Sequence, residues 1–387
     1  MTRPSVLNPG ELRWEMRLLA VVTATLVAFG IATIYGASSL VRTGSGVVGG
    51  SYALTQFSGA LAGGILMIAC SRLDYRLLRP LAWPIMLVSI GLVLITVLPF
   101  THAIAPTING ARRWVRLGPV GFQTSELARL AVIIWCAMLA TKKGEQVREF
   151  KKGVMPFLVI LGLTSLLVLL QPNLSMAVLI SLLGGIVLFT AGARIGHFLL
   201  LGVAAVVGVL QLVQRGGYWA ERLDLFINGA GASSQIHQSL VGIGSGGLLG
   251  VGFGQGQQKF GFVAYPYSDF IFSAIGEEWG FLGVVMVVFL FAVFCWLGFR
   301  IARTAEDPFG QYLAAGLTAA VGVTAVMHMA VTLSLMPTTG LTLPFVSYGR
   351  SSLVVSLAGA GILISIGRMR GKPEKRPARV PIVAMRG

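Results

Sequence analysis

The sequence has little charge, and negative charge is the scarcer of the two signs. Only 11% of its 387 residues are charged, with 14 Asp and Glu against 30 Lys and Arg. Soluble domains carry about a quarter charged residues, whereas 55% of this chain is hydrophobic. This composition excludes an ordinary soluble enzyme. Apolar runs of about 20 residues recur along the whole chain, which favours a helical membrane protein.

Cysteine is equally scarce. The three cysteines, Cys70, Cys136 and Cys295, fall in separate apolar runs. No CxxC motif and no Cys/His pairing accompanies them, so neither a disulfide framework nor a zinc site is supported. We expect all three to pack inside helices.

The apolar runs predict an all-α polytopic fold with ten spans. The predicted spans are 17–37, 53–70, 81–99, 124–141, 154–171, 174–192, 196–213, 269–299, 311–333 and 351–367. The first span lacks a small-residue cleavage pattern, so a cleavable signal peptide is not expected. The eighth, at about 30 residues, exceeds the bilayer and is expected to tilt or project from it. The spans leave an N-terminal tail at 1–16, a long loop at 214–268 and a basic C-terminal tail at 368–387.

The basic residues are divided unevenly between the two sides of the membrane. Most lie in the two tails and in alternate connections, and the positive-inside rule then places both termini in the cytoplasm. The net charge of +16 therefore reflects topology. Nucleic acid binding is not expected, because no platform of aromatic residues accompanies the basic residues. Arg112, Arg113 and Arg116 lie on the outer side, against this rule, and require another explanation.

Asp269 stands at the start of the eighth span, directly after the long 214–268 loop. An ionisable group at the mouth of a membrane helix is costly to keep, which makes it a functional candidate. Glu126 and Arg129 lie three residues apart at the start of another span and share one helix face. They form either a structural ion pair or, with Asp269, the lining of a polar cavity.

The remaining polar features admit structural roles. At least one of Glu277 and Glu278 is expected to bond a neighbouring helix, and His237 and His328 lack ligand-spaced partners. The glycine-rich run 242–256 predicts a flexible or re-entrant backbone rather than a stable helix. Five aromatic residues predict an interfacial belt: Trp114, Tyr218, Trp219, Tyr265 and Tyr267.

Five segments in a fixed order carry a resemblance to a known family. They are NGARRWVRLGPVGFQTSELARL, QPNLSMA, QSLVGIGSGGLLGVGFGQGQQKF, SDFIFSAIGEEWGFLG and GLTLPFVSYGRSSLV. Together they resemble the SEDS family (shape, elongation, division and sporulation), the ten-span bacterial membrane proteins that include FtsW and RodA. The resemblance covers about residues 18–367, and the run GQGQQKF is closer to the division-type members than to the elongation-type members.

The resemblance implies a glycosyltransferase that polymerises lipid II into glycan strands outside the cytoplasmic (inner) membrane. It implies a class B penicillin-binding protein and other division or elongation membrane proteins as partners. Asp269 would be the catalytic carboxylate, with Glu126 and Arg129 in the same cavity. Arg129 stands where the family more often has Lys.

The same resemblance implies that Arg112, Arg113 and Lys259 face the anionic groups of the substrate. Lipid II is α-linked and the polymer is β-linked, so a single inversion needs one general base on the acceptor 4-hydroxyl. Asp269 would supply it. The arginines, Lys259 or a bound divalent cation, Mg²⁺ or Mn²⁺, would stabilise the leaving pyrophosphate; the sequence identifies no metal ligands.

Three positions depart from the family pattern. The run from Ala264 to Ser268 replaces a Pro-Glu-Ala-His-Thr-like run, so a neighbouring Glu and His are missing, while Asn173 replaces Asp and Arg350 replaces Gly.

Two other functions stay open. A lipid II flippase would need polar groups continuing to the cytoplasmic side, which the spans lack, and a non-catalytic scaffold would dock the transmembrane helix of a partner.

Overall fold

Helices form nearly all of the regular structure. The computed structural model describes residues 9–38, 42–43, 46–47, 49–108, 110–118, 120–214, 226, 235–263 and 265–370. The long helices of these ranges are α1 (Pro9–Ser38), α2 (Gly49–Arg72), α3 (Leu78–Val97), α4 (Thr124–Lys143), α5 (Met155–Leu169), α6 (Leu174–Thr190), α7 (Ile195–Gln214), α9 (Gln235–Ser245), α10 (Ile271–Thr304), α11 (Pro308–Thr332) and α12 (Arg350–Arg368). Two short antiparallel hairpins pair β1 (Arg42–Thr43) with β2 (Gly46–Val47) and β3 (Trp114–Leu117) with β4 (Val120–Gln123).

Each of the ten predicted spans lies on one of these helices, which confirms the all-α polytopic fold. Eight of the described helices are long and apolar enough to cross a membrane, and α6 and α7 supply shorter apolar segments. α1 begins at Pro9 and so extends into the predicted N-terminal tail. The loop expected at 214–268 contains an additional helix, α9, which the sequence did not predict. Residues 371–387 of the predicted C-terminal tail lie outside the described residues.

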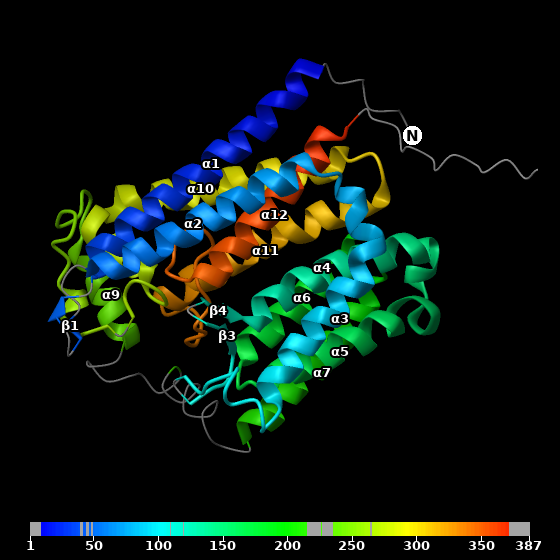
Figure 1. The fold of residues 1–387 in the computed structure, drawn as a ribbon, viewed down its shortest axis with the longest axis horizontal. Coiled ribbons are helices and arrows are strands. Elements are labelled where there is room, and N and C mark those ends of the chain that lie inside the picture. The colour runs from blue at the N-terminus through cyan, green and yellow to red at the C-terminus, as the bar shows by residue number, and fades with distance from the viewer. Residues whose placement is uncertain are drawn as a thin grey trace, which may run out of the picture.

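The helices form two groups that meet at α11 (Figure 1). In one group α12 packs against α2, and α10 packs against α1 and α11; in the other, α4 packs against α3 and α6, and α5 packs against α6. α11 joins them by contacting both α4 and α6. Glycine allows α2 and α12 to pack closely, because a Cβ added to Gly361 of α12 would lie 2.4 Å from the Met67 carbonyl oxygen of α2.

α10 contains a break at Gly280, whose φ of 65° and ψ of −163° are not helical. The break exposes backbone groups that would otherwise lack partners. The glycine-rich segment after α9 supplies those partners, since Phe281 N donates to Gly247 O at 2.9 Å and Val251 N donates to Glu277 O at 2.9 Å. The long eighth span is therefore two helical pieces joined around a docked loop.

Glycine is required in this docked loop because the backbones approach so closely. A Cβ at Gly250, whose φ is +84°, would lie 2.2 Å from the Glu278 carbonyl oxygen, and one at Gly246 would lie 1.9 Å from that of Gly276. Of the run 242–256, for which the sequence predicts a flexible or re-entrant backbone, residues 246–256 follow the end of α9 and form this docked loop. The expectation that no stable helix forms there is wrong for 242–245, which complete α9.

Four connections gather at one end of the bundle, the end that the charge bias assigns to the outside and that we call the outer end. Arg113 Nε of the α3–α4 connection donates to Gln171 O of the α5–α6 turn at 3.1 Å. Gln123 N donates to Ser351 Oγ at the start of α12 at 3.0 Å. Tyr348 N before α12 donates to Tyr267 O before α10 at 3.0 Å. These contacts position the site described next.

Candidate functional site

A cavity of about 950 Å³ lies at the outer end, between the gathered connections. Asp269 lines it from the segment before α10, and it is the only carboxylate among the described lining residues. Arg113 and Arg116 line it from the α3–α4 connection, and Arg350 lines it from the first residue of α12. The cavity therefore combines one acid with three guanidinium groups.

The backbone around Asp269 forms a tight turn. Asp269 N donates to Tyr265 O at 3.1 Å, and Ser268 Oγ lies 3.1 Å from Asp269 Oδ1. The segment before α12 holds this turn, because Ser347 Oγ donates to Ser268 O at 2.8 Å. A Cβ added to Gly340 would lie 4.0 Å from Asp269 Oδ2, so Oδ2 faces a position that carries no side chain. The carboxylate is partly buried and fixed in direction.

The three arginines reach the cavity in different ways. Arg113 donates to the carbonyl oxygens of Gln171 and Pro172, which fixes its guanidinium against the α5–α6 turn. Arg116 is exposed, whereas Arg350 is half-buried, with its Cγ packed where a Cβ on Gly59 would be 3.0 Å away. Arg350 begins α12, so its positive charge adds to the partial positive charge of a helix N-terminus. Sequence analysis noted Arg350 only as a departure from the family pattern and did not include it among the site residues. Its position at the start of the last helix could have indicated a place in the cavity.

Glu126 and Arg129 do not line this cavity. They form an ion pair of 2.8 Å with side chains 4% and 6% exposed. Arg129 lies 3.4 Å from Thr324 Oγ1 and 3.5 Å from Ser356 Oγ, and it borders a separate void of about 20 Å³. α4 begins at Thr124, so both residues already lie inside the bundle, facing α11 and α12. This arrangement matches the first of the two alternatives, a structural ion pair. The expectation that Glu126 and Arg129 share a cavity with Asp269 is therefore corrected.

Arg112 also differs from the expectation that it faces an anionic substrate. Its guanidinium donates to Ala105 O at 3.0 Å, Leu98 O at 2.8 Å and Thr101 Oγ1 at 2.7 Å. These three bonds hold the turn that follows α3. Arg112 is absent from the described lining of the large cavity, whereas its neighbour Arg113 belongs to it.

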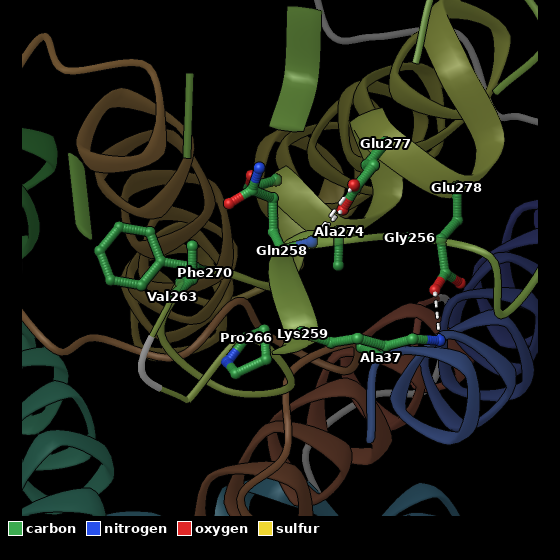
Figure 2. A pocket seen from close by; sticks show the side chains of 11 residues that line it. Ala37, Gly256, Gln258, Lys259, Val263, Pro266, Phe270, Ala274, Glu277 and Glu278 are labelled. Atoms are coloured by element: carbon green, nitrogen blue, oxygen red, sulfur yellow. Dashed lines mark hydrogen bonds and ion pairs between the residues drawn. The ribbon is translucent and has the colours of Figure 1, made fainter. Parts of the chain in front are cut away.

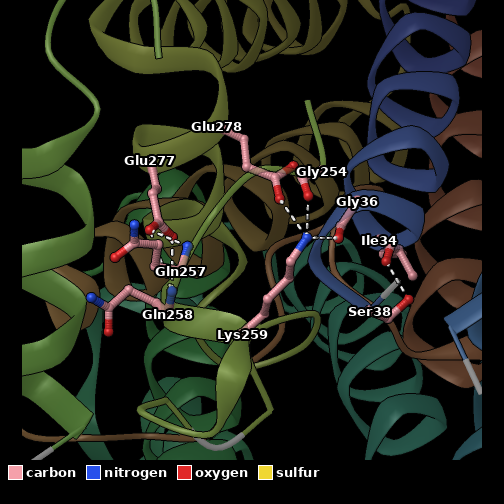
Figure 3. A network of polar contacts seen from close by, with 9 residues as sticks. All are labelled: Ile34, Gly36, Ser38, Gly254, Gln257, Gln258, Lys259, Glu277 and Glu278. Atoms are coloured by element: carbon pink, nitrogen blue, oxygen red, sulfur yellow. Dashed lines mark hydrogen bonds and ion pairs between the residues drawn. The ribbon is translucent and has the colours of Figure 1, made fainter. Parts of the chain in front are cut away.

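Lys259 lies in a buried polar network (Figure 3). Its Nζ is 3.7 Å from Glu278 Oε1, and it donates to Gly36 O at 3.1 Å and to Gly254 O. The adjacent Glu277 accepts from Gln257 N at 2.6 Å. Lys259 therefore links α1, the glycine-rich loop and α10, and it is absent from the described lining of the cavity in which the substrate was expected.

The space inside this network is small. The pocket bordered by Lys259, Glu277 and Glu278 has a volume of about 10 Å³ (Figure 2), which holds at most one water molecule. At least one of the two glutamates was expected to bond a neighbouring helix, but the structure pairs both with the segment that precedes α10: Glu277 accepts from Gln257 N, and Glu278 pairs with Lys259.

Three of the aromatic residues assigned to an interfacial belt line the cavity instead. These are Trp114, Tyr265 and Tyr267, and Tyr348 joins them. Burial, together with hydrogen bonding to Tyr52, holds the pKa of the Tyr267 hydroxyl well above its usual value. Tyr218 and Trp219 lie outside the described residues.

A divalent cation at Asp269 would need further ligands beside this carboxylate. Among the described residues, no three His, Cys, Asp or Glu side chains come together as metal ligands. Mg²⁺ is held by one or two carboxylates together with substrate phosphates, and Asp269 is the single described carboxylate of the cavity lining. The described residues do not form a protein-held site for the expected Mg²⁺ or Mn²⁺.

The fold and the site together define a multi-pass membrane protein with a basic, single-acid cavity at one end of its helical bundle. A family model described as cell cycle protein, covering FtsW, RodA and SpoVE, matches residues 16–372. The chain belongs to this family, which confirms the resemblance carried by the five segments.

Individual relatives agree with this assignment. The chain is 36% identical over 373 residues to a probable peptidoglycan glycosyltransferase FtsW of Geobacter sulfurreducens, covering 95% of this chain and 99% of that protein. It is 33% identical to the stage V sporulation protein E of Bacillus subtilis, covering 91% of this chain and 96% of the relative.

Two solved structures share the fold. One belongs to work described as the structural coordination of polymerization and crosslinking by a peptidoglycan synthase complex. It has a TM-score of 0.76 at 27% identity and covers 92% of this chain and 98% of that chain. The other is the rod shape determining protein RodA of Thermus thermophilus, with a TM-score of 0.68 at 28% identity, covering 92% and 97% of the two chains.

Proposed function

We propose that this protein is an inverting peptidoglycan glycosyltransferase that polymerises lipid II, with Asp269 as the general base. The observation that carries the proposal is the placement of one partly buried carboxylate with three arginines in a cavity of about 950 Å³. Ligand pockets for small molecules have volumes of about 300–1,000 Å³. The cavity therefore has the size and the charges for a sugar and its pyrophosphate.

Asp269 is suited to accept a proton from the acceptor sugar. Ser268 Oγ donates to Oδ1 at 3.1 Å, and Asp269 lines the large cavity, so its carboxylate lies where a bound sugar could reach it. In the reaction, the acceptor 4-hydroxyl oxygen bonds to C1 of the donor sugar as its proton moves to Asp269. The bond from C1 to the pyrophosphate oxygen breaks, and the configuration at C1 inverts.

The arginines would stabilise the negative charge that develops on the leaving pyrophosphate. Guanidinium groups bind phosphate oxygens in a bidentate manner and form strong, charge-assisted hydrogen bonds. Arg113 and Arg350 are held by neighbouring segments, so they are placed before the substrate arrives. This explains why basic residues of the α3–α4 connection lie on the side that the positive-inside rule disfavours.

The alternative of a lipid II flippase is less consistent with the charges below the cavity. A transport path needs polar groups that continue through the bundle. Glu126 and Arg129 lie deeper than the cavity, but they are paired with each other and border a void of only about 20 Å³. The deeper charges therefore act as structural links, which supports a reaction at the outer end.

We further propose that the protein works in the bacterial inner membrane with a class B penicillin-binding protein. The likeness to a chain from a peptidoglycan synthase complex that coordinates polymerization and crosslinking supports such a partner. In that setting the glycan made at Asp269 would pass to the crosslinking enzyme.

The test is polymerisation of purified lipid II by the wild-type protein and by Asp269→Asn, with and without the penicillin-binding partner. Loss of a general base lowers the rate by about 10²- to 10⁴-fold, and we expect a loss in that range with an unchanged melting temperature. Glu149→Gln is the matched control, since Glu149 is an exposed carboxylate outside the cavity. Glycan formed by Asp269→Asn at the wild-type rate would remove Asp269 as the base. Movement of labelled lipid II across liposomes without any polymer would favour the flippase.

A further inference from the structure

Aromatic residues gather on the side of the cavity that carries Asp269. Tyr265 and Tyr267 precede Asp269 in the chain, and Tyr348 precedes α12. The proton transfer and the phosphate contacts described above use none of these rings.

The rings form an ordered cluster. Tyr267 is 6% exposed and stacks on Tyr52 of α2 with ring centroids 4.4 Å apart. Tyr265 and Tyr348 meet Tyr267 edge to face, at centroid distances of 6.3 and 5.6 Å and interplanar angles of 84° and 82°. Such perpendicular contacts are favourable for aromatic rings. Tyr267 is therefore the fixed centre of the cluster.

Tyr265 is the tyrosine of this cluster whose ring is exposed in the cavity. It is 48% exposed although it lines the cavity and is in contact with Tyr267. Its φ of 55° is in the left-handed region, which is unfavourable for a bulky residue and is maintained only where the surroundings impose it. The surroundings do so here, because Tyr265 O accepts from Ser268 N at 3.0 Å and from Asp269 N at 3.1 Å. One turn thus fixes the backbone that carries both the Tyr265 ring and the Asp269 carboxylate.

We infer that Tyr265 is a stacking platform for the acceptor sugar, an N-acetylhexosamine whose hydroxyl group points toward Asp269. This inference rests on the proposed glycosyltransferase function. One face of a pyranose ring carries polarised C–H groups, and the negative face of an aromatic ring attracts them. The hydroxyl groups at the sugar edge then remain available to the carboxylate and the arginines. Tyr267 acts as a positioning residue that holds Tyr265 and does not touch the sugar.

If Tyr265 acts by stacking, its substitution by phenylalanine and its substitution by serine should have different effects. A phenylalanine keeps the ring and removes only the hydroxyl group, whereas a serine keeps a hydroxyl group and removes the ring. Tyr265→Phe should therefore behave like the wild type, and Tyr265→Ser should lose the contact. Tyr35→Ser is the matched control, since Tyr35 of α1 is 51% exposed and is not among the described lining residues.

The first experiment measures binding without catalysis. The probe is the soluble disaccharide N-acetylglucosaminyl-N-acetylmuramyl pentapeptide, and saturation-transfer NMR is recorded on the full-length protein in detergent. Wild type, Tyr265→Phe and Tyr35→Ser should transfer saturation to the C–H protons of one sugar face, and Tyr265→Ser should not. Equal transfer by wild type and Tyr265→Ser would overturn the inference, and so would equal losses by the Phe and Ser variants.

The second experiment measures lipid II polymerisation by the same proteins. Tyr265→Ser should raise KM for lipid II by about tenfold, with a smaller change in kcat and an unchanged melting temperature. An unchanged KM in this variant would overturn the stacking role while leaving the proposed function intact. A wild-type protein that binds the disaccharide but forms no polymer would instead overturn the proposed function and leave the sugar platform standing.

Discussion

Two polar regions flank the same short segment of the chain and differ in nearly every physical respect. The cavity at Asp269 has a volume of about 950 Å³, and its described lining carries three arginines and one carboxylate. The network at Lys259 encloses about 10 Å³ and pairs its lysine with Glu278 at 3.7 Å. Both regions contain residues, Asp269 and Lys259, to which the family resemblance assigned a role toward the substrate.

The difference shows how burial assigns a role to a charged residue. A charge enclosed with its partner links segments of the chain and is costly to disturb. A charge that lines a large cavity can exchange solvent for a ligand. Asp269 and Arg350 belong to the second kind, whereas Lys259 and the Glu126–Arg129 pair belong to the first.

The strongest test of this contrast removes the buried lysine. Lys259→Met would leave Glu278 in the interior without its cation, and Glu278 Oε2 already has no hydrogen-bond partner among the described residues. Breaking one side of a buried ion pair costs about 3–5 kcal/mol. We expect a correspondingly lower free energy of unfolding, measured by chemical denaturation in detergent.

The double variant Lys259→Met/Glu278→Gln provides the control, because it removes both charges. It should recover a large part of the lost stability. If Lys259→Met instead unfolded like the wild type but bound lipid II weakly, Lys259 would be a substrate contact and the contrast between the two regions would fail.

The sequence was sufficient for the fold because hydropathy and spacing report the environment of a whole helix. It predicted the helices that carry the ten spans and the place of Asp269 just before α10. It could not predict α9 or the break at Gly280, since a glycine-rich run and a continuous apolar run do not show which backbone groups will pair across them.

Side-chain direction was the other missing information. Arg112 and Arg113 are adjacent in one motif, yet one holds a turn and the other lines the cavity. Because neighbouring residues of an extended segment point to opposite sides, a shared motif cannot assign them a shared role. Lys259 and Arg129 were misplaced for a related reason, since each has a partner on a helix that is distant in the sequence, Gly36 for Lys259 and Thr324 for Arg129.

A smaller effect is expected from filling the space between the docked loop and α10. In Gly250→Ala the new Cβ would lie 2.2 Å from the Glu278 carbonyl oxygen, at a φ of +84°. Overpacking of this kind typically costs about 1–3 kcal/mol, and denaturation in detergent would measure it. Gly244→Ala is the control, because nothing lies within 4 Å of its added Cβ. Equal stability of the two variants would show that the loop is not docked against the break.

The smallest effect should come from a single cation of the cavity, and it should appear in catalysis rather than in folding. Arg350→Gln removes one charge from a half-buried position at the start of α12, and Arg113 and Arg116 remain. We expect kcat/KM for lipid II to fall by about tenfold, the size of one charge-assisted hydrogen bond, with no change in melting temperature. The dependence of kcat/KM on salt concentration should weaken as well, since exposed charges are screened by ions.

Arg148→Gln is the control for net charge, because Arg148 is a basic residue of the connection between α4 and α5. If Arg350→Gln lowered the melting temperature and left kcat/KM unchanged, Arg350 would belong with the structural charges, and the cavity would depend on Arg113 and Arg116 alone.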